Sequence, residues 1–291
     1  MQASGYEAPR SIEDTVALLQ GANGKARILA GGTDLLAQMR TGLVSPELLV
    51  DVKKIPEVTS IEVAADGSFR VGAAVCGAAL GENEALKSAW PGVVEAAELI
   101  GSAQIQGRAS LGGNLCNASP AADSVPALIS AGARCTIVGP SGTREEAVES
   151  IVTSPGQTSL ASGEFVVDFI LPAPAARSGS AYLRMIPRSE MDIAIVGAGV
   201  SLTLDESGTC TAARVGLAAV APTPLLVEEA AAALIGTSVD AAALEATAAA
   251  ATAAANPIDD KRGTVEYRKH VAGVITRRAA SIALERAREN A

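Results

Sequence analysis

A pair of glycines between a predicted strand and a predicted helix places a strong restriction on how this chain can fold. The apolar run at residues 26–30 leads directly into Gly31 and Gly32, and helical character resumes at residues 35–40. With a helix before it and a strand after it, this turn belongs to an α-β-turn-α-β layer over residues 11–52. Paired glycines let the backbone turn tightly and approach a ligand, so the turn is either an anion-binding loop or an ordinary β-α connection.

A second glycine pair, Gly112 and Gly113, lies in the stretch IQGRASLGGNLCNASPAADSVPAL. So many small and polar residues between two helices do not build a core. They suit a loop that surrounds a ligand with amides and side-chain oxygens, or a long structured surface loop. Neither pair belongs to a Rossmann GxGxxG fingerprint, and neither continues as the Gly-Lys-Ser/Thr of a Walker A loop.

The rest of the chain reads as short strands and helices. Asp66 and Gly67 between two apolar runs predict a hairpin, and Ser11 predicts a helix N-cap. Further helices are predicted at residues 78–86, 93–100, 125–131, 225–255 and 264–288. Further strands are predicted at 133–138, 165–171, 181–186, 193–204 and 211–220, the last three as an antiparallel sheet. The segment PAPAARSGS at 172–180 is the best linker candidate, and we place a domain boundary near residue 177.

Composition excludes several classes of protein. Aromatic residues are only 2% of the 291 residues, so the core must be aliphatic, and a base-stacking surface is disfavoured. The net charge of −9 would repel a nucleic acid, and 48% hydrophobic residues are too many for a disordered chain. The sequence shows neither a signal peptide nor an apolar segment long enough for a membrane span, so we expect a soluble, cytoplasmic protein.

Cysteine and histidine content restricts the metal chemistry. Cys76, Cys116, Cys135 and Cys210 have no CxxC spacing, so the sequence carries no local zinc or iron–sulfur signature. His270 is the single histidine and cannot form a multi-histidine site. We therefore expect reduced cysteines and no metal ligands in this chain, with Cys116 as a small buried filler.

Three stretches together resemble the FAD-binding medium subunit of the molybdenum hydroxylases, the xanthine dehydrogenase and aerobic carbon monoxide dehydrogenase family. AGGTDLLAQMRTG is similar to that family's first flavin loop, and ASLGGNLCNASPAAD is similar to its second. YLRMIPRSEMDIAIVGAGV is similar to the start of its C-terminal domain. Their order and separations also fit, so the resemblance covers nearly the whole chain.

The resemblance implies an α+β fold with an α/β N-terminal part. Residues 1–176 would form a two-subdomain FAD-binding domain of the vanillyl-alcohol oxidase type, with subdomains at about 1–57 and 58–176. Residues 177–291 would form a small C-terminal domain of three-stranded antiparallel sheet and helices.

The resemblance also implies which residues bind FAD. Backbone amides of the two glycine loops would hold the pyrophosphate from opposite sides, and Asp123 would accept hydrogen bonds from cofactor hydroxyls. Ile100 would lie against one region of the isoalloxazine ring, and Val166 would lie near the other region of that ring. Arg184 stands where several relatives have a lysine near the flavin, and its rigid planar fork changes that contact. The implied cofactor-binding residues are Leu29, Ala30, Gly31, Gly32, Thr33, Asp34, Leu35, Ile100, Ser110, Leu111, Gly112, Gly113, Asn114, Asp123, Val166 and Arg184. FAD would be non-covalent, because His270 is far from both loops in the sequence.

The function implied by the resemblance is electron transfer. In this family a molybdenum cofactor on a large subunit hydroxylates the substrate, and two [2Fe–2S] clusters on a small subunit carry the electrons to FAD. The FAD of the medium subunit then passes them to an external acceptor, so this chain would need no catalytic side chain. It would be one subunit of a dimer of heterotrimers.

Two alternatives remain at the level of the sequence. One is a free-standing FAD oxidoreductase of the same wider fold, which the alanine-rich, aromatic-poor second part disfavours. The other is a scaffold that has lost its flavin, which the intact glycine pairs disfavour. The substrate of the complex (a purine, carbon monoxide, an N-heterocycle or an aldehyde) and the acceptor (NAD, a quinone, a cytochrome or oxygen) stay open.

Overall fold

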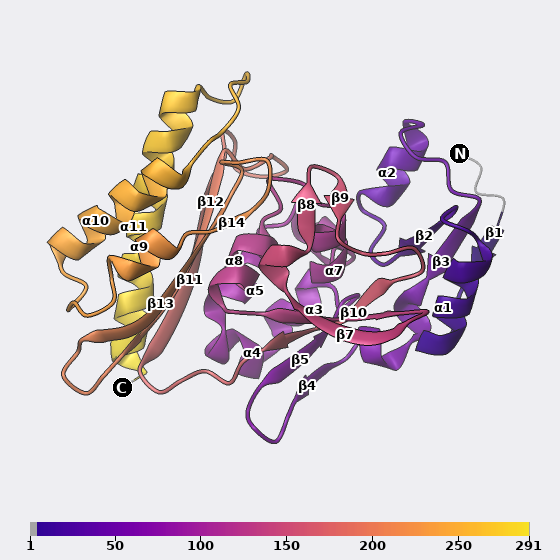
Figure 1. The fold of residues 1–291 in the computed structure, drawn as a ribbon, viewed down its shortest axis with the longest axis horizontal. Helices are drawn as coiled ribbons and strands as arrows, with labels where there is room; N and C mark the ends of the chain where they lie inside the picture. The colour runs from indigo at the N-terminus through magenta and orange to yellow at the C-terminus, as the bar shows by residue number, and fades with distance from the viewer. Residues whose placement is uncertain (1–4, 291) are drawn as a thin grey trace.

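The computed structural model describes residues 5–290 and contains three main β-sheets with helices around and between them. Figure 1 shows the chain advancing along the long axis of the molecule, from the N-terminal sheet at one end to the C-terminal helices at the other. A mixed α/β architecture is therefore confirmed.

The first sheet is small and parallel, with the strand order β1-β3-β2. Its elements are β1 (Gly5–Glu7), α1 (Ile12–Gly21), β2 (Ala26–Leu29), α2 (Leu35–Arg40) and β3 (Leu48–Asp51). They confirm the predicted α-β-turn-α-β layer. Ser11 is the predicted N-cap, since its Oγ accepts a hydrogen bond from the amide of Asp14 at 3.1 Å. The pattern did not predict β1, because three residues are too few to show alternation.

The second sheet is antiparallel, with the order β4-β5-β10-β6-β7. Its strands are β4 (Ile61–Val63), β5 (Phe69–Gly72), β6 (Arg134–Gly139), β7 (Gly142–Ala147) and β10 (Phe165–Leu171). The hairpin predicted around Asp66 and Gly67 is confirmed by the pairing of β4 with β5. The last of these strands, β10, lies at the centre and joins the two hairpins into one sheet. A short hairpin of β8 (Val152–Ser154) and β9 (Gln157–Thr158) precedes it.

Short helices and turns connect these strands. They are η1 (Val52–Lys54), η2 (Pro56–Val58), η3 (Val148–Ser150), α3 (Gly77–Glu82), α4 (Glu84–Ala89), α5 (Pro91–Glu98), α6 (Ala103–Gln106), α7 (Leu111–Cys116) and α8 (Ser124–Ser130). The single helix predicted at 78–86 is wrong, because Asn83 ends α3 and its Oδ1 caps the amide of Leu86 in α4 at 2.9 Å. The glycine-rich stretch at 101–122, which contains the second glycine pair and is expected from the sequence to be a loop, is partly helical because it includes α6 and α7.

The third sheet is antiparallel and has four strands, so the prediction of three was wrong. The elements of this part are β11 (Ser178–Met185), β12 (Val196–Leu204), β13 (Cys210–Ala218), β14 (Leu225–Leu226), α9 (Glu228–Ala232), α10 (Ala241–Ala254) and α11 (Val265–Glu289). The additional strand, β14, has only two residues and precedes alanine-rich helices, so the pattern assigned it to helix. β11 also begins inside the predicted linker, which leaves only residues 172–177 outside a strand.

Two apolar clusters lie mainly in the N-terminal part and one in the C-terminal part, and all three are built mainly from aliphatic side chains as predicted. Helix α8 lies between the second and third sheets (Figure 1), where it contacts β12 and β13. Polar contacts tie the two parts together as well: Arg214 Nε of β13 donates to the carbonyl of Ile129 at 2.9 Å, and its Nη2 pairs with Glu149 at 2.8 Å. The domain boundary near residue 177 stays a prediction.

Candidate functional site

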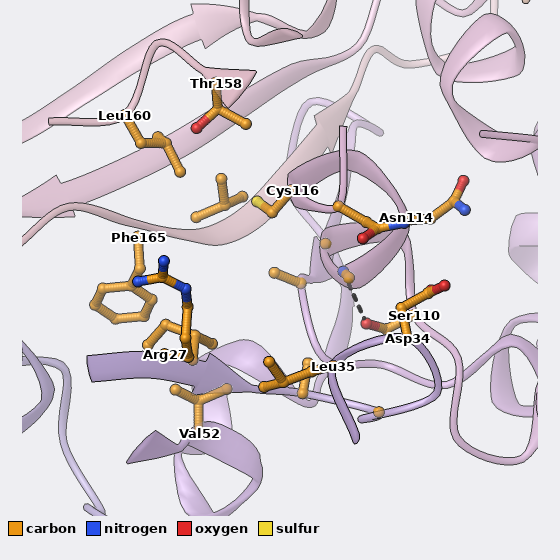
Figure 2. Close-up of a pocket in the computed structure, with 18 of the residues that line it drawn as sticks. Arg27, Asp34, Leu35, Val52, Ser110, Asn114, Cys116, Thr158, Leu160 and Phe165 are labelled. Carbon is orange, nitrogen blue, oxygen red and sulfur yellow. Dashed lines mark hydrogen bonds between the residues drawn. The ribbon is translucent and has the colours of Figure 1, made fainter. Parts of the chain in front are cut away.

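A cavity of about 580 Å³ lies between the first sheet, α7 and the β9–β10 connection. This volume falls in the range of about 300–1,000 Å³ that is typical of small-molecule and cofactor sites. Figure 2 shows Asp34, Ser110 and Asn114 on one side of the cavity, and Arg27 and Phe165 on the other.

The cavity brings together most of the residues that the sequence nominated. Those that line it are Ala30, Gly31, Gly32, Thr33, Asp34, Leu35, Ile100, Ser110, Gly112, Gly113, Asn114 and Val166. Those outside its lining are Leu29, Leu111, Asp123 and Arg184. Segments far apart in the chain thus converge on one hollow, although their individual contacts with a cofactor stay predictions.

The first loop lines this cavity and contains a row of free amides. The backbone N–H groups of Gly31, Gly32, Thr33 and Asp34 have no hydrogen-bond acceptor within residues 5–290. Gly31 also passes so close to the second loop that a Cβ at this position would lie 1.9 Å from the carbonyl oxygen of Arg108. Gly32 adopts φ +79°, in the left-handed region that favours glycine. Consecutive free amides of this kind form a concave anion-binding surface.

The second loop is built differently. Ser110 caps α7, and its Oγ accepts a hydrogen bond from the amide of Gly113 at 3.1 Å, drawn as a dashed line in Figure 2. The amide of Gly112 donates to the carbonyl of Ala73 at 3.0 Å, and that of Asn114 to the carbonyl of Ser110 at 3.0 Å. These three amides already have partners within the protein, so they are not free donors like the amides of Gly31 to Asp34. Gly113 lines the cavity with backbone alone, because it has no side chain that would project into the cavity.

Hydrogen bonds between side chains fix the position of the two loops relative to each other. Gln38 Nε2 of α2 donates to Asn117 Oδ1 at 2.8 Å, and both residues line the cavity. Asn114 Oδ1 accepts hydrogen bonds from the amide and the hydroxyl of Ser124, at 3.1 and 2.7 Å. Helix α2, which follows the first glycine pair, is therefore fixed to the end of α7, which contains the second pair, and α7 is fixed to α8.

Asp123 and Arg184 form a buried cluster beside the cavity. Asp123 Oδ1 accepts a hydrogen bond from the hydroxyl of Tyr182 at 2.9 Å, and its Oδ2 pairs with Arg184 Nη1 at 2.7 Å. Burial raises the pKa of Asp123, and the charge of the Arg184 guanidinium opposes that rise. Both carboxylate oxygens are thus engaged by β11, so the predicted contacts of Asp123 and Arg184 with a cofactor stay predictions.

The cavity also has walls that the sequence did not nominate. Arg27, Gln38, Thr158, Leu160 and Phe165 all line it. Arg27 lies in β2, the strand before the first glycine pair, so its position in the sequence could have identified it as a lining residue. The β8–β9 hairpin gave no signal, because PGQTSLASGE reads as an ordinary polar loop.

Cys116 faces the cavity instead of the core. Its surface is open to the hollow, so the expectation of a buried filler was wrong. The surrounding protein nevertheless desolvates the thiol and raises its pKa to about 12. Burial likewise raises the pKa of Asp34 in the first loop.

Two further findings bear on the class of site. Within residues 5–290, no three His, Cys, Asp or Glu side chains lie close enough together to hold a metal ion. None of the helices in this part of the chain has both the length and the apolar character needed to cross a bilayer.

Comparisons with protein families cover nearly the whole chain. Residues 2–174 match the FAD binding domain in molybdopterin dehydrogenase. Residues 181–283 match the CO dehydrogenase flavoprotein C-terminal domain. The two matches follow each other in the order that the sequence motifs suggested.

Individual relatives are similar along their full length. The carbon monoxide dehydrogenase medium chain of Afipia carboxidovorans is 37% identical over 284 residues, 97% of each chain. The xanthine dehydrogenase FAD-binding subunit of Escherichia coli O157:H7 is 30% identical over 282 residues, covering 97% of this chain and 96% of that one. A crystal structure of the Cu,Mo-CO dehydrogenase in its cyanide-inactivated form has a chain that superposes with a TM-score of 0.93 at 36% identity. The match covers 98% of this chain and 100% of that one.

Proposed function

The chain belongs to the FAD-binding medium subunits of the molybdopterin dehydrogenases, the family of carbon monoxide dehydrogenase and xanthine dehydrogenase, and we propose that it relays electrons through FAD to an external acceptor. As a member of this family it is a subunit of an oxidoreductase. The electrons would come from [2Fe–2S] clusters of a small partner subunit. The observation that carries the proposal is the convergence of both glycine loops on one cavity whose first loop offers free amides.

The residues that line the cavity fit FAD. The amides of Gly31 to Asp34 would hold the pyrophosphate, and the bare surface of Gly113 would let the cofactor pass close to α7. Ile100 and Val166 would contact the flavin ring with apolar surface. When bound, FAD supplies the redox chemistry, so the protein has to bind it, orient it and limit its access to water. We propose that binding is non-covalent.

The partners follow from the family. We propose a large subunit with the molybdenum cofactor and a small subunit with two [2Fe–2S] clusters, assembled as a cytoplasmic dimer of heterotrimers. Similarity to medium chains such as that of Afipia carboxidovorans, which is 37% identical over 97% of each chain, supports this. The substrate would be chosen by the large subunit.

The test is affinity purification of the tagged chain from its native host, followed by absorbance spectroscopy and metal analysis. We expect flavin, iron and molybdenum together with two co-purifying subunits. Denaturation with acid should release the flavin into the supernatant, as a non-covalent cofactor requires. Flavin on a lone chain without iron or molybdenum would contradict the relay and favour a free-standing FAD oxidoreductase.

A further inference from the structure

Lys53 lies directly behind the first glycine loop. It belongs to η1, which follows β3, and its Nζ donates to the carbonyl oxygen of Ala30 at 2.7 Å. The same ammonium pairs with Asp51 Oδ1 at 2.7 Å. Asp51 is itself fixed, because it accepts hydrogen bonds from the amide of Lys53 at 3.0 Å and from the hydroxyl of Tyr6 at 2.7 Å. The ammonium group is therefore held in one place, and it is bound to the loop by the hydrogen bond to the Ala30 carbonyl.

The hydrogen bond from Lys53 to Ala30 determines the direction of the N–H of Gly31. The C=O of Ala30 and the N–H of Gly31 belong to one planar trans peptide, so they point in opposite directions. Ala30 and Gly31 line the cavity, whereas Lys53 does not. A carbonyl that is drawn back toward Lys53 leaves the Gly31 N–H directed at the cavity, where it has no acceptor within residues 5–290.

Net charge is the weaker part of the effect. The ammonium of Lys53 is paired with the carboxylate of Asp51, so the pair adds little net charge to the loop. Within the lining itself, Arg27 is accompanied by the acidic side chains of Asp34 and Glu164. Because the positive and negative side chains of the cavity offset each other, binding of a diphosphate there depends on backbone amides that point toward it.

We propose that Lys53 is a positioning residue for the diphosphate of the cofactor, acting by orienting the Ala30–Gly31 peptide. This inference rests on the proposed function, because it assumes that the cavity holds FAD. It adds a role for a side chain that lies outside the cavity and in neither glycine motif.

The test compares Lys53→Met with Lys54→Met in the full-length chain after removal of flavin. Methionine keeps the aliphatic stem and removes the donor, and Lys54 is an exposed neighbour in the same turn. Titration followed by flavin fluorescence should give a dissociation constant for FAD about five- to tenfold higher for Lys53→Met than for the wild type. Lys54→Met should match the wild type. Lys53→Arg can still donate to both oxygens and should restore most of the affinity.

A comparison of ligands separates positioning from a general structural role. Lys53→Met should weaken binding of ADP, which has a diphosphate, and leave binding of riboflavin, which has none, unchanged. Equal weakening of both, or a wild-type affinity for FAD and ADP, would overturn the role of Lys53. Should the unpaired carboxylate impair folding, the double variant Asp51→Asn/Lys53→Met removes it and should show the same loss of FAD affinity. Absence of FAD binding by the wild type would overturn the proposed function as well.

Discussion

Gly113→Ala should separate cofactor binding from fold stability, because the affinity for FAD should fall while the stability of the flavin-free chain should not. Gly113 lies in the first turn of α7 at the cavity surface, and an added Cβ would lie 3.2 Å from Ser110 Oγ, a tight contact that a small shift of this hydroxyl would relieve. Its φ is not positive, so alanine is compatible with the backbone. Replacing glycine by alanine inside a helix stabilises it by about 0.5–1 kcal/mol, so the Tm of the flavin-free chain should stay level or rise by about 2 °C.

The same methyl group would occupy space that we assign to the cofactor. Overpacking by one methyl typically destabilises a complex by about 1–3 kcal/mol, which corresponds to a roughly 5- to 150-fold rise in the dissociation constant for FAD. The assay is a fluorescence titration together with a thermal melt of the flavin-free chain. Gly107→Ala is the matched control, since this exposed glycine lies outside the cavity and a Cβ there would come no closer than 3.7 Å to another atom. Wild-type affinity in Gly113→Ala would refute the placement of FAD against α7.

The sequence predicts that Gly32→Val and Gly113→Val both lower the flavin content. Gly32→Val is nevertheless a poorer test of where FAD binds. At φ +79° a side chain is strained, and a Cβ at Gly32 would lie 2.9 Å from Leu29. Loss of flavin from this variant would therefore reflect a distorted loop as much as a filled cavity.

Three further results are expected. Arg184→Ala should destabilise the chain by about 3–5 kcal/mol in urea unfolding, because it leaves a buried carboxylate unpaired, and Arg184→Lys should lose less. Hydrogen bonds from the Arg262 amide and from Arg268 lower the pKa of Asp260 from 3.8 to about 2, so ionised Asp260 stabilises the fold above pH 3.8. The stability difference between wild type and Asp260→Asn should accordingly shrink as the pH falls through that interval, as urea unfolding would show. Cys116 should react slowly with iodoacetamide at pH 8, faster with each rise in pH, and least when FAD is bound, as measured by mass spectrometry.

The first loop could be predicted from the sequence because its causes are local. A strand of apolar residues, two glycines and a helical segment are contiguous, and each is recognised by a pattern shorter than ten residues. The structure confirms β2, α2 and β3 where they were predicted. The contact that orients this loop could not be predicted, because Lys53 reaches back across 23 residues to the carbonyl of Ala30.

The second loop was harder to predict for the opposite reason. Its composition predicts a loop, yet Ser110 caps a helix and the amide of Gly112 donates to the carbonyl of Ala73, a residue that the sequence pattern had not connected with it. Tertiary contacts therefore decide the local conformation. The four-stranded sheet escaped prediction in the same way, since β14 is recognisable only through its pairing with Gly216 and Leu217.

Asp123 shows how the C-terminal part supports the cavity without lining it. The carboxylate receives a hydrogen bond from Tyr182 and pairs with Arg184, both on β11, and the next residue, Ser124, donates twice to Asn114 in the cavity wall. The wall is thus connected to the third sheet through two neighbouring residues at the start of α8. Without β11, Asp123 would be a buried charge with neither partner, and burial would favour its neutral form. Asp123 and Arg184, which the sequence assigned to a cofactor contact, therefore join the two parts of the chain, and Ser124 extends this connection to the cavity wall.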